Sequence, residues 1–401
     1  MKRLLVCVLI ICMLLSLAAC WSAEEPSDLG IINSIVYDLD EEENFVIVAQ
    51  VINTAGIGGN TLTSSSAEKN PFITLRGVGT SPANAVYNMT SMAEKSVFAA
   101  HNKVRFVSER LASNELKFKT FLDYINRDHY TDESVLMVII NNEDIDKVYK
   151  STIGLATLPG DFVEDLHNQQ QQQSSRAIFM RTFEFLRECH LEGKESVLGR
   201  LQFIPTEETP SQNPGGEIKD AKYQVLSEGL AFFKGFKMAG MLNGEDTEIY
   251  NILTNNSRVM RFDLNEDQDI VSVILVKPKT EIKVTKGGEQ LYVNIKVKAT
   301  MALRTFYVNG VTEANYKERL KEITPKAEEH LAKKTYESVQ KVLEMGSDIY
   351  GFGKSLHEQS PKVWREIAND WDKYFKNAIV TVSYDLIFNR EGESDIPFVR
   401  D

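Results

Sequence analysis

The chain has 401 residues, of which 43% are hydrophobic and 25% charged, as in a globular protein large enough for two or three domains. Its formal net charge of −12 disfavours nucleic acid as a partner and offers no polybasic help at an anionic lipid surface. Beyond residue 20 the apolar runs are only strand-sized, as at 270–276, so the body of the chain is not expected to cross a membrane.

The first 20 residues have the pattern of a secretory leader. Lys2 and Arg3 precede an apolar run at 4–15, which is followed by Ser-Leu-Ala-Ala-Cys at 16–20. Leu-Ala-Ala-Cys resembles the lipobox of bacterial lipoproteins, in which the cysteine thiol receives a diacylglyceryl group and becomes the new N-terminus. We therefore expect 1–19 to be a lipoprotein signal peptide and Cys20 to be lipidated; the alternative is an ordinary cleaved signal. Two acyl chains hold a protein stably at a membrane without surface charge.

Loss of the leader changes the charge and the cysteine inventory. The mature chain keeps 43 basic against 57 acidic side chains, a net charge of about −14. Cys7 and Cys12 leave with the leader and Cys20 is acylated, so Cys189 is alone and no intrachain disulfide is expected. We expect Cys189 to be a buried small hydrophobe on a helix.

The N-terminal half alternates between strand and helix patterns. The expected elements are strands at 31–37 and 45–52, a loop at 56–70, a helical segment at 81–93, a strand at 104–107, a helix at 114–126 with Leu116, Phe121, Leu122 and Ile125 on one stripe, a strand at 135–140, a helix from 141–149, a glutamine-rich connector or helix surface at 168–175, and an amphipathic helix at 177–191. This order predicts a mixed sheet with helices packed on it.

Residues 205–220 are rich in proline, glycine and polar side chains, and we interpret them as a linker. They separate an N-terminal α+β region at 20–204, expected to hold two subdomains, from a C-terminal α+β domain at 221–401.

The C-terminal half predicts long strands followed by helices. The expected elements are a hairpin of 230–233 and 236–242 around Lys234-Gly235, strands at 270–276 and 291–303 with a turn at Gly287-Gly288, a long helix starting at Thr324-Pro325, a helix starting at Ser360-Pro361, and a last strand at 378–388. Trp364 and Trp371 are seven residues apart and should face one core.

The sequence contains no recognisable catalytic, nucleotide-binding or metal-binding motif. Gly353-Lys354-Ser355 ends like a phosphate-binding loop, but Asp348 stands where the first glycine of that motif belongs. The six histidines are scattered without metal-site spacing, and Cys189 and His190 would point about 100° apart on a helix. We expect no catalytic residues, no cofactor and no metal, and hence no enzyme.

Several stretches together resemble the C-subunit lipoproteins of spore germinant receptors, the GerAC/GerBC/GerKC family of endospore-forming bacteria. The matching features are Trp21 directly after Cys20, the strand pair at 28–32 and 46–51, the segment from 98 to 112, the hairpin from 230 to 245, and a C-terminal signature of Asp348-Ile-Tyr-Gly-Phe-Gly353, Leu356-His357, Pro361, Trp364 and Trp371-Asp372. The sequence departs from the usual pattern after Trp21 and at Gly30.

The resemblance implies a non-enzymatic subunit of a membrane receptor complex, required for nutrient-triggered spore germination. The subunit would be lipid-anchored on the outer face of the spore inner membrane, beside an A and a B subunit that are integral membrane proteins. The family fold is α+β, in three domains that each pair a mixed or antiparallel sheet with helices. Only the lipidated Cys20 carries over as a site residue.

Two interpretations stay open at this point. The signature cluster would be core packing or, alternatively, a surface that faces a partner. The chain itself would be an assembly subunit or, alternatively, a lipoprotein that binds an amino acid or sugar nutrient in a cleft between its halves.

Overall fold

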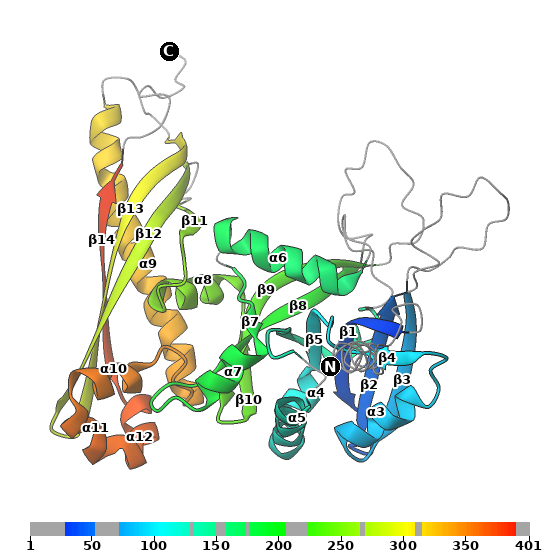
Figure 1. Ribbon diagram of the computed structural model, residues 1–401. Helices are drawn as coiled ribbons and strands as arrows, with labels where there is room; N and C mark the ends of the chain where they lie inside the picture. The colour runs from blue at the N-terminus through cyan, green and yellow to red at the C-terminus, as the bar shows by residue number, and fades with distance from the viewer. Residues whose placement is uncertain are drawn as a thin grey trace, which may run out of the picture.

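The computed structural model describes residues 29–52, 72–128, 132–148, 158–173, 176–205, 223–264, 269–308 and 315–389. In these ranges the strands form one sheet of ten strands and one of four, and helices pack against both (Figure 1). The α+β class expected from the sequence is confirmed. Cys20 and the expected loop at 56–70 lie outside the described residues.

The larger sheet is mixed, with a parallel centre and antiparallel flanks. In spatial order its main path is β10 (Lys237–Leu242), β9 (Tyr223–Lys234), β8 (Val197–Pro205), β6 (Leu136–Ile140), β5 (Val104–Ser108), β1 (Leu29–Leu39), β2 (Phe45–Ile52) and β3 (Phe72–Gly79). The short strands β4 (Ser96–Phe98) and β7 (Met180–Arg181) pair with β1 and β6. Strands β8, β6, β5 and β1 run parallel, and the other pairs of the main path are antiparallel. The predicted strand pair near the N-terminus is therefore confirmed as β1 and β2.

The helices of the N-terminal half are α3 (Pro82–Thr90), α4 (Glu109–Ser113), α5 (Glu115–Arg127), α6 (Pro159–Gln173) and α7 (Thr182–Cys189). Helix α5 is capped by the side chain of Asn114 and buries three of the four residues predicted for its apolar stripe. Leu116 is 71% exposed, and Phe118 takes the fourth core position. Phe118 gives the spacing of three, four and seven residues that one helix face requires.

The helix predicted at 177–191 is wrong in its first turn. Residues Met180–Arg181 form β7 beside β6, and the helix begins only at Thr182. The Glu184 carboxylate accepts the Arg181 N–H at 2.8 Å, which satisfies one of the free amides at this helix start. The chain before Thr182 is therefore not helical and joins the sheet at Met180, which a stripe of hydrophobic positions alone does not reveal.

Two other segments of this half also depart from simple expectation. The helix expected from 141–149 is only the 3₁₀ turn η3 (Asn142–Asp144) in the described part. The glutamine run, predicted as a connector or a helix surface, continues α6 as far as Gln173.

The predicted linker joins two neighbouring strands of the larger sheet. Strand β8 ends at Pro205 and β9 begins at Tyr223, and the two pair antiparallel from Val197↔Phe232 to Pro205↔Tyr223. The hairpin of β9 and β10, with Gly235 at a φ of +58° in its turn, is confirmed, and it extends the sheet of the N-terminal half. The division at 205–220 remains a prediction, but the hydrogen-bonded sheet runs across it.

The C-terminal sheet consists of β11 (Val259–Asp263), β12 (Ile270–Gly287), β13 (Gln290–Tyr307) and β14 (Ile379–Phe388), in that spatial order. Strands β12 and β13 form the predicted hairpin, with Gly288 at a φ of +64° in the turn. Strand β14 is parallel to β13, from Tyr292↔Ile379 to Met301↔Phe388.

The long helix α9 (Tyr316–Met345) packs on one face of this sheet and starts earlier than predicted. Pro325 was expected to open the helix but lies inside it. Ile323 and Ala327 are both buried, so packing holds the turn on either side of Pro325 despite the missing N–H. After Gly346, which ends α9 at a φ of +72°, come α10 (Phe352–Gln359), α11 (Pro361–Ile367), the 3₁₀ turn η5 (Ala368–Asp370) and α12 (Trp371–Lys376).

One hydrophobic core extends through both sheets. It includes Ile35 of β1 and Leu386 of β14 as members of a single cluster of buried side chains. Helix α8 (Gly244–Leu253) lies where the sheets meet and packs on β9 and β10 as well as on β12 and α9. The two halves are therefore joined by packed apolar side chains and not only by the chain connection.

Candidate functional site

Cys189 is a partly buried thiol at the end of α7. Its Sγ lies 3.4 Å from the Ser196 Oγ, and apolar core residues pack beside it. Burial raises the pKa of the thiol to about 11, so it is protonated and weakly nucleophilic near neutral pH. This environment fits the structural role expected from the sequence.

The described residues contain no group of three or more His, Cys, Asp or Glu side chains that could hold a metal ion. Among the same residues, no helix combines the length and the apolar character needed to span a membrane.

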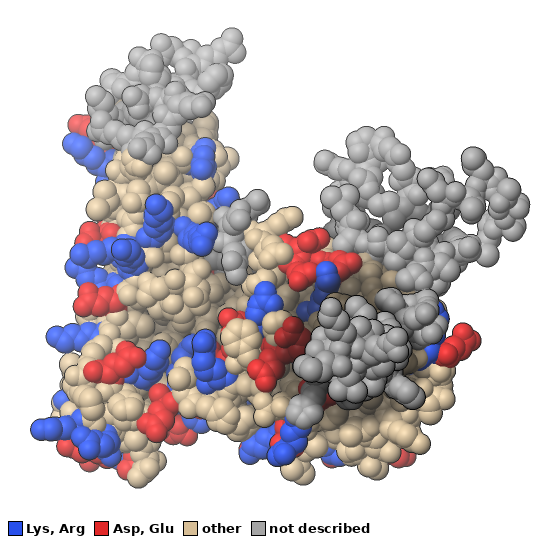
Figure 2. Space-filling view, viewed as in Figure 1, with Lys and Arg blue, Asp and Glu red and all other residues tan. Residues whose placement is uncertain are grey.

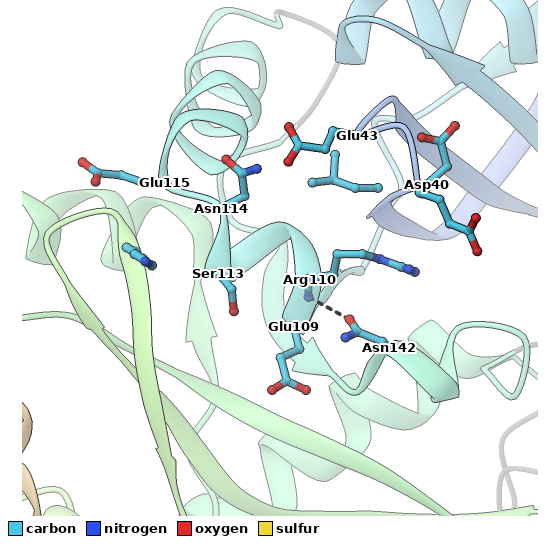
Figure 3. A pocket seen from close by; sticks show the side chains of 11 residues that line it. Asp40, Glu43, Glu109, Arg110, Ser113, Asn114, Glu115 and Asn142 are labelled. Carbon is cyan, nitrogen blue, oxygen red and sulfur yellow. Dashed lines mark hydrogen bonds between the residues drawn. The ribbon is translucent and has the colours of Figure 1, made fainter.

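An open groove lies between the turn that joins β1 to β2 and the starts of α4 and α5 (Figure 3). Its volume is about 680 Å³. Its walls carry carboxylates from two segments of the chain, Asp40, Glu41 and Glu43 in the β1–β2 turn and Glu109 and Glu115 at the starts of α4 and α5. Two cations, Arg110 and Lys237, also line it. The groove is therefore acidic on balance and hydrated, with Leu39 as its large apolar wall.

Arg110 is held in a fixed position at one side of this groove. Its Nε and Nη2 donate to the two carboxylate oxygens of the buried Asp38 at 3.1 and 2.7 Å. Its backbone N–H donates to the Asn142 Oδ1 at 2.7 Å, the contact drawn in Figure 3. The bidentate pair joins α4 to β1, so this guanidinium serves the fold.

The β1–β2 turn forms the acidic rim of the groove. Asp40 accepts the N–H groups of Glu42 and Asn44 at 3.0 and 2.8 Å. Loss of hydration opposes ionisation of Asp40, but these hydrogen bonds outweigh it and hold the pKa of the carboxyl below its usual value. Glu43 sits at a φ of +59°, which closes the turn. Asp40 therefore stays anionic under mildly acidic conditions.

The C-terminal signature lies where the two halves meet. The loop between α7 and β8 passes beside the start of α10, and the Lys354 N–H donates to the Gly193 carbonyl at 2.8 Å. A Cβ on Gly353 would stand 2.8 Å from the Gly193 Cα and 2.8 Å from the Trp364 ring. Glycine is therefore required at this close approach.

Asp348 stabilises the same junction through hydrogen bonds to both of its segments. Its side chain is buried, and its two oxygens accept the N–H groups of Phe352 at 2.9 Å and Gly353 at 2.8 Å. Its backbone carbonyl accepts the Glu195 N–H of the neighbouring loop at 2.9 Å. Burial raises the pKa of this carboxyl to about 7, although the amide hydrogen bonds favour the anion.

The two signature tryptophans pack against each other. Trp364 and Trp371 are 5% and 7% exposed, and their rings meet edge to face with centroids 5.2 Å apart. His357 stacks on Trp364 at a centroid distance of 5.8 Å. Core packing, the first of the two interpretations of this cluster, therefore describes the tryptophans and Gly353.

Sequence reasoning found the signature but missed its partners. Gly193, Lys194 and Glu195 lie about 155 residues earlier in the chain and carry no local motif. The groove was missed for the same reason, since its walls come from four segments whose charges look like ordinary solvated faces. The sheet register brings these segments together, and one sequence alone does not reveal it.

Comparison with known families places both halves of the chain in one group. Residues 22–203 match the family described as "Spore germination protein N-terminal domain", and residues 228–392 match "Spore germination B3/ GerAC like, C-terminal". The boundary between the matches falls close to the predicted linker.

Relatives match over nearly their full length. Spore germination protein KC of Bacillus subtilis (strain 168) is 22% identical over 98% of this chain and 97% of its own. Spore germination protein YndF of the same organism is 20% identical over 98% of both chains. The crystal structure of the GerBC protein superposes with a TM-score of 0.51 at 16% identity, covering 88% of this chain and 96% of GerBC, which supports the fold.

Proposed function

Because the chain belongs to the GerAC family of spore germination proteins, we propose that it is the lipid-anchored C subunit of a germinant receptor. The observation that carries this proposal is the ordered match to both family domains, together with a relative of equal length that is named for spore germination. The expected resemblance to this family is thereby confirmed, and the finer role is our inference from it.

In this role the protein acts by binding and not by catalysis. The groove is open and hydrated, and Cys189 is protonated, so neither provides an activated nucleophile. We infer that Cys20 carries a diacylglyceryl anchor on the outer face of the spore inner membrane, beside integral A and B subunits. Confinement to the membrane raises the effective concentration of weakly interacting surfaces, which lets modest contacts assemble a receptor.

Replacing Cys20 by alanine tests the anchor. We expect the Cys20→Ala protein to move from the membrane to the soluble fraction, because one thioether holds both acyl chains. The germination response to nutrient should fall by at least about tenfold, since the gain from membrane confinement is of that order or larger. Cys189→Ser is the matched control and should change neither the membrane association nor the germination response. Spores that germinate normally while the Cys20→Ala protein is soluble would refute the anchor's role.

The partners are tested by crosslinking in spore membranes. We expect the wild-type protein to form adducts with integral membrane proteins, and mass spectrometry should identify them as receptor A and B subunits. Adducts that contain only soluble proteins would contradict the proposed assembly.

Direct binding of a small nutrient is the second candidate function, and the groove would be the binding site. An acidic groove of about 680 Å³ would accommodate the ammonium group of an amino acid. Calorimetry with common amino acids and sugars should show no binding at micromolar concentrations if assembly is the main role. Micromolar binding that is weakened by Glu43→Gln, and not by Glu133→Gln away from the groove, would favour the second candidate.

A further inference from the structure

One face of the C-terminal sheet is exposed across three strands. Helix α9 packs on the opposite face, where Thr335 of α9 and Tyr384 of β14 share a buried hydrogen bond of 2.8 Å. On the free face, side chains alternate outward along β12, β13 and β14, and the burial patterns of all three strands show this alternation. Figure 1 shows this sheet in front of α9.

The register aligns the outward side chains into rows. From the β12–β13 turn along the sheet, the rows are Thr285–Tyr292–Ile379, Lys283–Asn294–Thr381, Glu281–Lys296–Ser383 and Lys279–Lys298–Asp385. The members of all four rows are exposed. The two glycines of the hairpin turn end the face on one side. On the other side β12 is irregular between Val276 and Lys279, while β13 and β14 continue to the outward pair Thr300–Ile387.

Lysine is the dominant charge on this surface, which we call the lysine face and define by Lys279, Lys283, Lys296 and Lys298. Glu281 and Asp385 are the acidic members of the same rows. In the described chain none of the four lysines forms a salt bridge, and Lys277 is exposed beside them. Figure 2 shows Lys and Arg side chains recurring down this part of the molecule, with Asp and Glu side chains between them. A chain with a net charge of −12 thus carries a local cationic surface.

The composition of the lysine face does not suit the core of a protein interface. Such cores are enriched in aromatic residues, methionine and arginine and are depleted in lysine, glutamate and serine. The central rows contain Lys, Glu, Asn, Thr and Ser, and the exposed apolar side chains lie at the two ends of the face, Tyr292 and Ile379 beside the hairpin turn and Ile387 beyond Asp385. Binding energy at protein interfaces comes mostly from buried aromatic and arginine anchors, which these rows do not supply.

The same features suit a hydrated anionic surface. Lysines near an anionic bilayer attract it while they remain hydrated, and each is worth on the order of fivefold in partitioning. Tyr292 at the margin matches the amphipathic aromatic side chains found at headgroup level. The remainder of the chain is acidic and is repelled by such a bilayer, which favours one orientation of the molecule over others.

We propose that the lysine face lies against the headgroups of an anionic phospholipid bilayer. The proposal rests on the proposed function, because the anchor at Cys20 brings the face to the membrane. The anchor then keeps the protein close to the bilayer, and contact of the lysine face with the headgroups sets the orientation of the protein.

Lysine reactivity in the anchored protein tests this orientation. The acylated full chain is reconstituted into vesicles of phosphatidylcholine alone or with phosphatidylglycerol, treated with an amine-reactive ester, and analysed by mass spectrometry. On phosphatidylglycerol vesicles we expect the lysine face to react several-fold more slowly, because contact with the headgroups covers its amines. The attraction that brings them there acts within a Debye length of about 10 Å. Exposed lysines elsewhere, Lys321, Lys333, Lys362 and Lys376, provide the internal control and should react equally on both vesicles.

A second measurement removes the contribution of the acyl chains. The mature chain, which starts at residue 20, is prepared with Cys20→Ala and mixed with phosphatidylglycerol vesicles at low salt, and the bound fraction is measured by flotation. Changing the four lysines of the lysine face to Gln should lower partitioning by about 100-fold or more. The same change at the four control lysines should have a much smaller effect, and salt should weaken wild-type binding.

The outcomes separate this inference from the proposed function. If the protein stays anchored through Cys20 but the lysine face reacts at the same rate on both vesicles, the inference is overturned and the anchor stands. If the lysines of this face react slowly even without vesicles, and more slowly as the protein concentration rises, a second copy of the chain covers the face, and the lipid assignment is overturned. If protection requires the integral receptor subunits, the occupant is an acidic protein surface, and the lipid assignment is also overturned.

Discussion

Replacing Trp364 by alanine is expected to lower the free energy of unfolding by about 4 kcal/mol, the usual cost of deleting a buried indole. The ring lies between His357 and Trp371, and it also touches the site where a Cβ on Gly353 would stand. The substitution therefore leaves a cavity at the junction between the two halves. Urea unfolding of the full chain, followed by tryptophan fluorescence and circular dichroism, measures the loss.

Two controls separate ring packing from a general effect of truncation. Trp364→Phe keeps an aromatic ring between the same neighbours and should cost much less, because its only polar loss is the 3.4 Å contact of Nε1 with the Glu192 carboxylate. Tyr307→Ala removes a ring that is 58% exposed and should change stability by less than about 0.5 kcal/mol. A Trp364→Ala protein as stable as Tyr307→Ala would show that the signature does not hold the junction.

The second large effect concerns Asp348 and pH. Burial raises the pKa of its carboxyl in the folded protein to about 7, from an ordinary value of 3.8. The folded state therefore binds the proton more tightly than the unfolded chain does, and the stability linked to this proton is complete below about pH 4 and lost as the pH rises through 7. We expect this one group to reduce stability by roughly 1 kcal/mol per pH unit in that window.

Asp348→Asn isolates this contribution. The variant cannot ionise, and one of its amide hydrogens would face a backbone N–H, so it should be less stable than the wild type at pH 4. The difference between the two proteins should shrink as the pH rises toward 7, and thermal unfolding at several pH values measures it. Asp385→Asn, on the exposed face of β14, should leave the slope unchanged. Parallel stability profiles for wild type and Asp348→Asn would contradict a raised pKa at Asp348.

Elements with strong local signals were predicted well. The hairpins at Lys234-Gly235 and Gly287-Gly288 combine alternating strands with glycines that adopt positive φ values, and both form as expected. The strand at 378–388 alternates its buried residues as its sequence does. These predictions succeeded because turn chemistry and alternation act within a few residues.

Predictions that depended on tertiary packing were less accurate. Pro325 looked like the start of a helix, but buried residues on both sides carry the helix across it. Met180 lies within the helix predicted at 177–191, but in the structure it pairs with Met137 of β6. In each case contacts from distant segments decided the outcome, and they outweighed the local preference.

The candidate sites were predictable to different degrees. Cys20 stands in a local motif and could be named from the sequence, and it remains a prediction because it lies outside the described residues. The lysine face was not predicted from the sequence, because the net charge of the whole chain says nothing about a local cluster of lysines. Alternate lysines along two strands become one surface only when the β12–β13 register is known.

The pairing of β8 with β9 constrains how this family can change. A gene fragment that started after residue 220 would carry β9 and β10 away from β8 and leave a long open edge on each product. Exchange of whole halves between paralogues would also require the Asp348 junction and the shared apolar core to match. Recombination at the apparent domain border should therefore yield viable chimaeras only between closely related parents, and we expect the two halves to have diversified as one inherited unit.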